Sequence, residues 1–265
     1  MQYLFNVWEN IESRLEKAKG ILLLLDFDGT VTGIADRPED AKLSPEMGRI
    51  LGLLAKKKGF KVAIISGRSL SDLKEKVKIG NIIYVGNHGL EIERGGERFI
   101  YPQASEAVQT MKELEKILKV EIGSIKGVIL EDKGVGLAVH YRLVKNSEVS
   151  ELKRRVRQIF KQFMEKGKIR IGEGKRLIEA KPPIIWDKGR AASLLLDSFK
   201  REEPFSVYLG DDRTDEDAFS ALDREGITIF VGKPRKSKAK FFLKNVREVE
   251  AFLKRLSALE MGSPK

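Results

Sequence analysis

Short, continuously apolar runs that end in small or polar residues constrain the fold of this chain most. They are ILLLLDFDG (21–29), KVAIISG (61–67), IIYVGNHG (82–89), VYLGDD (207–212) and ITIFVG (227–232). Amphipathic helical patterns lie between several of them, at 45–57, 187–199 and 215–222. Strands that are apolar throughout are typical of a parallel sheet with helices on both faces. The sequence therefore predicts an α/β core of Rossmann-like type.

The segment from about 103 to 180 has a different pattern. It shows a helix, two strand-like stretches (KGVILEDKG and VGLAVHYRL), a second helix, and then KIRIGEGKRLIEAKP. This order favours an antiparallel sheet with helices on one of its faces. We therefore predict that residues 103–180 form an inserted α+β domain, and that residues 1–102 and 181–265 together form the α/β core.

Composition excludes several kinds of chemistry. The 265 residues include no cysteine and only two histidines, so disulfides, thiol catalysis and thiolate zinc sites are excluded, and any metal should be a hard, oxygen-bound ion. The N-terminus carries no targeting pattern, and the longest apolar run, Ile21 to Leu25, is too short to cross a bilayer. We expect a cytoplasmic monomer with no membrane partner.

The net charge of +11 raises the question of nucleic-acid binding. In the densest basic segment, 147–163, apolar residues recur at helical spacing and leave Lys153, Arg154, Arg157 and Lys161 on the other face. This is the pattern of a solvated helix face, and no nucleic-acid motif accompanies it. We expect no nucleic-acid partner.

Polar groups end four of the apolar runs, and carboxylates dominate two of these ends. In a parallel sheet such groups meet at the carboxyl edge, where ligands bind. Five of the seven residues from Asp211 to Asp217 are carboxylates. Like charges at this density repel one another unless they are solvated, placed at a helix N-terminus or gathered round a cation. For part of the run, Thr214 to Asp217, the sequence predicts a helix capping box.

The motif DFDGT (26–30), together with the distant GDD, Ser66 and the WDKG of 186–189, resembles the haloacid dehalogenase superfamily of phosphotransferases. The resemblance implies that Asp26 is the nucleophile and becomes an aspartyl phosphate. It implies that Asp28 protonates the leaving oxygen and then activates water. Ser66 would hold a phosphoryl oxygen, and Lys188 would neutralise charge shared by the nucleophile and the phosphoryl group.

The same resemblance implies that the carboxylates of the acidic run gather round a metal ion. Asp26, the backbone carbonyl of Asp28 and the side chain of Asp211 would ligate Mg²⁺, with Asp212 and Asp215 on metal-bound waters or further out. A divalent cation would remove the repulsion between an anionic nucleophile and a dianionic phosphate.

Over nearly the whole chain the sequence is similar to trehalose-phosphate phosphatases. The segments that carry this similarity are DFDGTVTGIADRPEDAKLSPE, VAIISGR, YVGNHGLEI, LEDKGVGLAVHYR, GKRLIEAKPPIIWDKG and YLGDDRTDEDAF. The family resemblance implies hydrolysis of the sugar phosphate trehalose 6-phosphate to trehalose and phosphate, in trehalose biosynthesis. It also implies that residues 103–180 form a cap domain for substrate recognition.

The similarity also implies the substrate-binding residues. Those that would contact the distal glucose from the cap are Glu131, Lys133, His140, Arg142, Arg176 and Glu179. Further substrate contacts would come from Arg37, Gly67, Arg68, Asn87, His88 and Lys175.

Rival functions remain open at the level of sequence. The related enzymes are phosphatases of sucrose phosphate or mannosyl-phosphoglycerate, and a phosphohexomutase that uses the same aspartate. A rival of another class is a nucleic-acid-binding protein on a degenerate enzyme scaffold, which would show salt-sensitive binding to duplex DNA without phosphatase activity.

Overall fold

The structure, a computed structural model, describes residues 1–35, 37–174, 176–223 and 226–262 of the chain. The chain divides into two compact units: a larger unit of Met1–Phe99 with Trp186–Lys265, and a smaller unit of Ile100–Ile185. Short 3₁₀ helices occur at Leu4–Val7, Pro38–Asp40, Asn87–Gly89 and Lys200–Glu202.

The larger unit is built on a sheet that has nine strands within the described residues. In chain order the strands are β1 (Gln2–Tyr3), β2 (Ile21–Asp26), β3 (Phe60–Ile65), β4 (Ile83–Gly86), β5 (Glu91–Arg94), β6 (Glu97–Ile100), β11 (Phe205–Gly210), β12 (Ile227–Val231) and β13 (Phe241–Leu243). Their order in the sheet is β1-β13-β12-β11-β2-β3-β4-β5-β6. Pairing is parallel from β1 to β4, and β5 runs antiparallel to β4.

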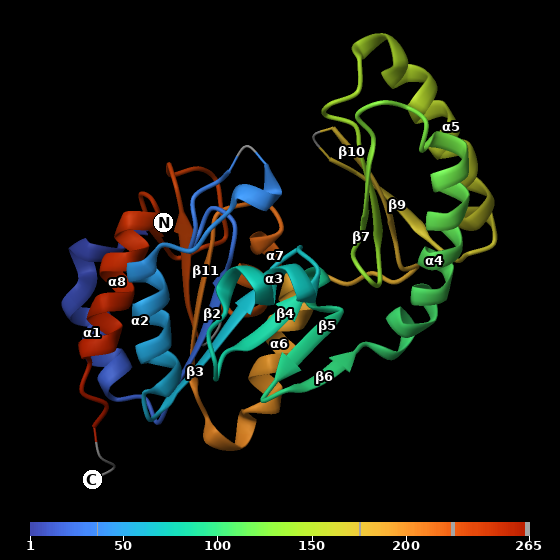
Figure 1. Cartoon of the computed structure of the whole chain (residues 1–265). Helices are drawn as coiled ribbons and strands as arrows, with labels where there is room; N and C mark the ends of the chain where they lie inside the picture. The colour runs from blue at the N-terminus through green and yellow to red at the C-terminus, as the bar shows by residue number, and fades with distance from the viewer. Residues whose placement is uncertain (36, 175, 224–225, 263–265) are drawn as a thin grey trace. The chain divides into compact units, whose positions relative to one another are not determined.

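Helices cover both faces of this sheet. They are α1 (Trp8–Glu16), α2 (Pro45–Lys56), α3 (Leu70–Val77), α6 (Lys188–Ser198), α7 (Asp215–Ala221) and α8 (Val246–Ala258). Side chains of a strand alternate between faces, so Leu23 and Leu25 of β2 share a core with α1, α2, α3 and α8. Leu22 and Leu24 share the opposite core with α6 and α7. Figure 1 shows α1, α2 and α8 on one side of the sheet and α6 on the other. The predicted parallel sheet with helices on both faces is confirmed.

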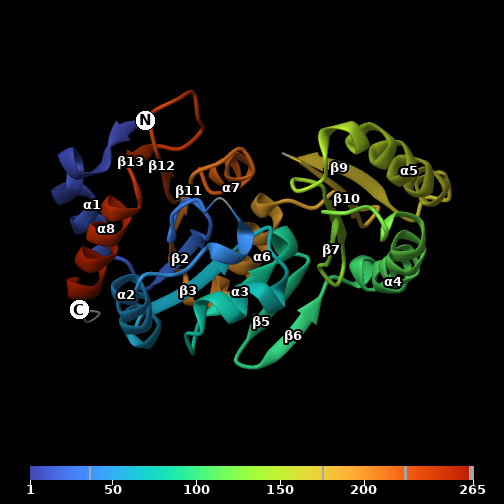
Figure 2. The ribbon, with the colours of Figure 1, turned by 45° about the horizontal axis from the view of Figure 1, so that its top comes forward.

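The smaller unit is an antiparallel sheet packed against two helices. Its strands are β7 (Ile129–Asp132), β8 (Leu137–His140), β9 (Arg170–Gly174) and β10 (Leu177–Lys181), in the order β7-β8-β10-β9. Helices α4 (Pro102–Ile122) and α5 (Asn146–Glu165) lie side by side and bury one core with β8 and β10 (Figure 2). The α+β architecture predicted for this segment is therefore confirmed.

The basic face of α5 is exposed and partly neutralised. Arg154 and Arg155 both contact Glu151, and Arg157 contacts Glu173. Such exposed pairs belong to an ordinary solvated helix surface. Among the described helices, none combines the length and the apolar character that a membrane crossing requires.

Candidate active site

The carboxyl ends of the central parallel strands hold the polar residues that the sequence predicts there. Asp26 is the last residue of β2, Ser66 follows β3, Asn87 follows β4 and Asp211 follows β11. Asp26, Ser66 and Asn87 are all buried. The carboxyl ends of these apolar strands are therefore lined by polar side chains, as expected for an α/β ligand site.

Lys188 enters this edge from the first residue of α6. Asp187 fixes the helix start, since its carboxylate accepts the backbone N–H of Arg190 at 2.8 Å. The Lys188 ammonium donates to Oδ1 of Asp26 at 2.6 Å and to Oδ1 of Asp215 at 2.8 Å, and it is only 3% exposed. Burial opposes the charge of Lys188, but Asp26 and Asp215 overcome this and raise its pKa. The lysine is a permanent buried cation beside Asp26.

Asp215 is saturated with hydrogen-bond donors. Its Oδ1 accepts from Lys188 and from the Tyr208 hydroxyl at 2.8 Å, and its Oδ2 accepts from the backbone N–H groups of Asp211 and Asp212 at 3.0 Å. A carboxylate has about four lone-pair sites, so these donors occupy them all. Asp215 is thus an organiser that joins Lys188 to the loop after β11.

Asp211 has a carboxylate oxygen with unused hydrogen-bonding capacity. Its Oδ1 is buried and accepts no hydrogen bond from the described residues. Burial, followed by the charges of Asp215 and Asp212, raises the pKa of Asp211 to about 6. Gly29 makes this packing possible, because a Cβ there would lie 2.1 Å from the Asp211 carboxylate, and its φ of +86° favours glycine.

These carboxylates fit a hard cation. One oxygen each of Asp26, Asp211 and Asp215 lie within 4.8 Å of one another, although the Asp215 oxygens already accept four hydrogen bonds. Burial disfavours the charged form of Asp26, the adjacent Lys188 ammonium favours it, and the net effect in the metal-free protein is a raised pKa. A divalent cation would coordinate the buried oxygen that lacks a donor. It would also favour the ionised form of the carboxyl groups whose pKa values are raised.

The loop after β11 differs from the expected capping box. Thr214 stands before α7 but makes no side-chain cap; its hydroxyl and its backbone N–H both donate to Oδ1 of Asp212 at 2.7 Å. Burial opposes the charge of Asp212, but Lys188 and these hydrogen bonds lower its pKa. The capping-box prediction was wrong: Asp212, two residues away, accepts the Thr214 backbone N–H that the box would direct to Asp217, and the Thr214 hydroxyl caps no backbone N–H of α7.

Asp28 faces an arginine. The Arg68 guanidinium donates from Nε to Oδ2 of Asp28 at 2.6 Å and from Nη2 to Oδ1 at 2.7 Å. Ser66 lies next to this pair, and its hydroxyl accepts the backbone N–H of Arg68 at 3.2 Å. Arg68, which the family resemblance assigns to the substrate, is thus engaged with the expected acid–base residue in this structure.

The loops after β3 and β4 are tied together. Backbone N–H groups of Asn87 and His88 donate to the carbonyls of Arg68 and Ser66, at 2.7 and 2.8 Å. Both Asn87 and His88 adopt positive φ, and a Cβ on Gly67 would lie 2.6 Å from the His88 ring. The Asn87 amide donates to buried Glu91 at 2.5 Å. Gly67, Asn87 and His88 therefore form one compact wall beside Ser66.

In the smaller unit, the residues expected to bind glucose pair with one another. His140 Nε2 and Glu131 Oε2 lie 2.7 Å apart, and Lys133 donates to Glu179 at 2.8 Å. Lys181, which the sequence analysis did not single out, contacts the other Glu179 oxygen at 3.0 Å. Burial opposes the charge of Glu179, but Lys133 and Lys181 lower its pKa below the usual value. These are charged groups held in position on one sheet.

The other expected substrate residues lie at the periphery of their units. Arg176 has a φ of +61° and donates to the Asn146 side chain at 3.1 Å, and Arg142 is exposed beyond β8. Arg37 is exposed in the larger unit, just before Pro38–Asp40. Lys175 lies outside the described residues.

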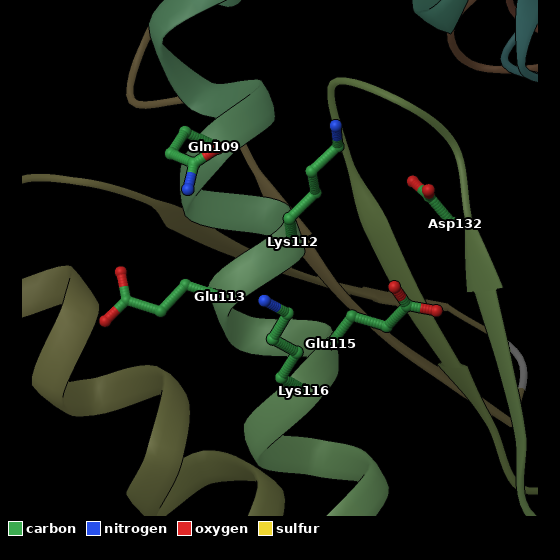
Figure 3. Close-up of a pocket in the computed structure, with 6 residues that line it drawn as sticks. All are labelled: Gln109, Lys112, Glu113, Glu115, Lys116 and Asp132. Carbon is green, nitrogen blue, oxygen red and sulfur yellow. The ribbon is translucent and has the colours of Figure 1, made fainter.

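Two hollows have charged linings. One of about 380 Å³ lies beside the loop after β11, with a mainly basic lining: Arg213, Glu216, Arg235, Lys236, Ser237 and Lys238. The other, of about 450 Å³, lies on the smaller unit between α4 and β7 and is lined by Gln109, Lys112, Glu113, Glu115, Lys116 and Asp132. Figure 3 shows Lys112 and Glu115 extending from α4 toward β7, whereas Glu113 points away. Its mixed charges suit a solvated helix face, and none of the expected site residues lines it.

The fold and the site together define a class of enzyme. A buried aspartate at the end of a central parallel strand, a lysine at a helix start and carboxylates after a neighbouring strand are the parts of a haloacid dehalogenase-type phosphotransferase. Comparison with known proteins supports this assignment. The chain is 26% identical to a solved trehalose-6-phosphate phosphatase of Aspergillus fumigatus, with a TM-score of 0.65 and coverage of 95% of this chain and 97% of that one. A solved trehalose-6-phosphate phosphatase related protein shares the fold with a TM-score of 0.76 at 24% identity, over 90% and 97% of the two chains.

The sequence comparisons are more specific. The family model described as trehalose-phosphatase matches residues 24–247. A probable trehalose-phosphate phosphatase of Oryza sativa subsp. japonica is 32% identical over 279 aligned residues, which cover 97% of this chain and 75% of the rice protein. The chain therefore belongs to the trehalose-phosphatase family, and it is a phosphatase, as the sequence predicted.

Proposed function

We propose that the chain is a Mg²⁺-dependent phosphatase that hydrolyses trehalose 6-phosphate to trehalose and phosphate in trehalose biosynthesis. The family and the names of the rice and Aspergillus relatives support the substrate. The observation that carries the chemistry is the buried contact of 2.6 Å between Lys188 and Asp26. A carboxylate that neighbours a permanent cation is poised to accept a phosphoryl group.

The reaction assigns distinct tasks to the residues of the larger unit. A carboxylate oxygen of Asp26 attacks phosphorus, and the bond from phosphorus to the sugar oxygen breaks. Asp28 gives a proton to the departing sugar oxygen and later takes one from the water that attacks the aspartyl phosphate. Lys188 offsets the negative charge shared by Asp26 and the phosphoryl group, and Ser66 offers its hydroxyl to a phosphoryl oxygen.

Asp26, Asp211 and the backbone carbonyl of Asp28 would hold Mg²⁺. When bound, the ion would neutralise charge between the carboxylates and the phosphate dianion. The buried Asp211 Oδ1 without a donor supports this set. Asp215, whose lone-pair sites are filled, would act by orienting Lys188 and the loop, and Asp212 would fix the loop through Thr214.

Residues 103–180 would serve as the substrate-recognition cap. Glu131 with His140, and Lys133 with Glu179, present paired donors and acceptors that sugar hydroxyls can bridge. Recognition of the second glucose would then favour closure and exclude water from the reaction.

Phosphate release from a panel of sugar phosphates tests the proposal. The panel contains trehalose 6-phosphate, sucrose phosphate, mannosyl-phosphoglycerate and glucose 6-phosphate, each with Mg²⁺ and with EDTA. We expect the highest kcat/KM on trehalose 6-phosphate and loss of activity in EDTA. A higher kcat/KM on another member would reject the substrate, and full activity in EDTA would reject the metal.

A further inference from the structure

The contact between Arg68 and Asp28 is more constrained than a surface ion pair. The guanidinium makes two parallel bonds to the two Asp28 oxygens, at 2.6 and 2.7 Å, and the Arg68 side chain is only 11% exposed. A bidentate fork fixes the plane of a carboxylate as well as its position. The orientation of Asp28 is therefore set by Arg68.

Arg68 is itself fixed from two further sides. Its Nη1 donates to Oδ2 of Asp72 at 2.7 Å, and its guanidinium lies over the Phe27 ring at 5.4 Å. Asp72 belongs to the first turn of α3, where Ser69 caps the helix through the Asp72 N–H at 3.2 Å. The chain of contacts runs from a helix start through Arg68 to Asp28.

Asp72 has no place in the proposed chemistry. Within the described part of the chain, its carboxylate also lies near Lys76, whose ammonium is 3.7 Å away and donates to the carbonyl of Glu39 at 3.0 Å. Among the described residues, the contact that links Asp72 to the reaction is therefore the one with Arg68. The fork still leaves lone-pair sites on both Asp28 oxygens for a proton.

We infer that Asp72, acting through Arg68, is a positioning residue that aligns Asp28 with the leaving oxygen; this rests on the proposed role of Asp28. In the step concerned, the phosphorus–oxygen bond breaks as Asp26 bonds to phosphorus, and the departing oxygen takes the Asp28 proton. Misalignment of a general acid penalises basic leaving groups, which need the proton, and spares groups that leave readily as anions.

A series of aryl phosphates tests the alignment of Asp28 with substrates that contain no sugar. Phenyl phosphate has a basic leaving group, whereas 4-nitrophenyl phosphate has a good one, and kcat/KM reports the steps up to transfer onto Asp26. For Asp72→Asn we expect kcat/KM to fall about tenfold on phenyl phosphate and less than about twofold on 4-nitrophenyl phosphate. Because both rates come from one preparation, any loss of folded protein cancels in their ratio.

Two more variants sharpen the test. Arg68→Lys keeps the charge but loses the fork, so we expect a selective loss on phenyl phosphate at least as large as that of Asp72→Asn. Glu75→Gln removes an exposed carboxylate from the same helix and should leave the ratio unchanged.

The outcomes separate this inference from the proposed function. Equal losses on both aryl phosphates in Asp72→Asn, or no loss, would overturn the positioning role while wild-type hydrolysis of trehalose 6-phosphate stands. A selective loss supports the positioning role even if the sugar phosphate panel favours another substrate.

Discussion

The Tyr208 hydroxyl donates a hydrogen bond of 2.8 Å to Oδ1 of Asp215, and both residues are fully buried. The same oxygen accepts from Lys188. Burial, followed by the charge of Asp215, raises the pKa of Tyr208 well above its usual value, so the phenol stays a donor. Tyr208 therefore helps to fix the carboxylate that orients Lys188.

Replacement of Tyr208 by phenylalanine tests this support. Tyr208→Phe keeps the edge contact with Phe219 but removes one donor from Asp215. We expect about a tenfold loss of kcat, the lower end of the effect of an outer ligand-orienting group, and a stability loss of about 1 kcal/mol. Kinetics and thermal unfolding measure the two effects.

Tyr84→Phe is the matched control. The Tyr84 hydroxyl donates to the Ile79 carbonyl at 2.6 Å and accepts its N–H at 2.9 Å, in the same unit but in none of the contacts described for the site. It should lose similar stability with unchanged kcat. Equal kinetic losses in the two variants would mean that the Tyr208 effect is general loosening.

The nucleophile assignment gives the largest expected effect. Asp26→Asn replaces a carboxylate by an amide of nearly the same shape, which is a poor nucleophile. Phosphate release should fall by more than about a thousandfold, on the scale of other nucleophile deletions, while circular dichroism shows an intact fold. Turnover near that of the wild type would remove Asp26 from its role.

The metal assignment separates two carboxylates of the acidic run. Asp211→Asn should raise the Mg²⁺ concentration for half-maximal activity at least about tenfold, because it removes a ligand. Asp217→Asn, an exposed residue in the first turn of α7, should change it little. An equal Mg²⁺ requirement in both variants would contradict the assignment of Asp211 as a metal ligand and of Asp217 as an exposed helix residue.

The pKa of Asp211 predicts how metal-free stability depends on pH. Its folded pKa of about 6 lies above the ordinary 3.8, so the folded state binds more protons between these values and stability falls as pH rises through them. In EDTA, the free energy of unfolding of Asp211→Asn should therefore equal that of the wild type near pH 4. Above pH 6 it should be higher than that of the wild type by about 1 to 2 kcal/mol, after allowance for solvent screening. Thermal unfolding across this range measures the difference, and Mg²⁺ should stabilise the wild type at lower concentrations than it stabilises the variant. A constant difference at every pH would mean that Asp211 does not carry the effect.

Patterns along single segments were enough to predict the fold and the edge that carries the site. Continuous apolar strands place Asp26, Ser66 and Asp211 at one edge of the sheet because parallel strands end together. Contacts between distant segments could not be predicted in this way. The Arg68–Asp28 pair joins residues 40 positions apart, and Tyr208 sits within an apolar run where its hydroxyl gives no periodic signal. The capping box failed for a different, local reason: Asp212, two residues before Thr214, accepts the Thr214 backbone N–H that the box requires.

The last prediction separates sugar recognition from phosphoryl transfer. If Glu179 reads the distal glucose, Glu179→Ala should lose about 2 to 4 kcal/mol in kcat/KM on trehalose 6-phosphate, the scale of buried charged hydrogen bonds. Hydrolysis of 4-nitrophenyl phosphate should change little, because that substrate has no second sugar.

Glu173→Ala is the matched control: it removes an exposed carboxylate on the adjacent strand β9 and should affect neither substrate. Glu179→Ala also removes the carboxylate that Lys133 and Lys181 share, so the thermal unfolding of this variant is measured together with its kinetics. Equal losses on both substrates would show that Glu179 supports the fold of the smaller unit, and the glucose assignment would fall.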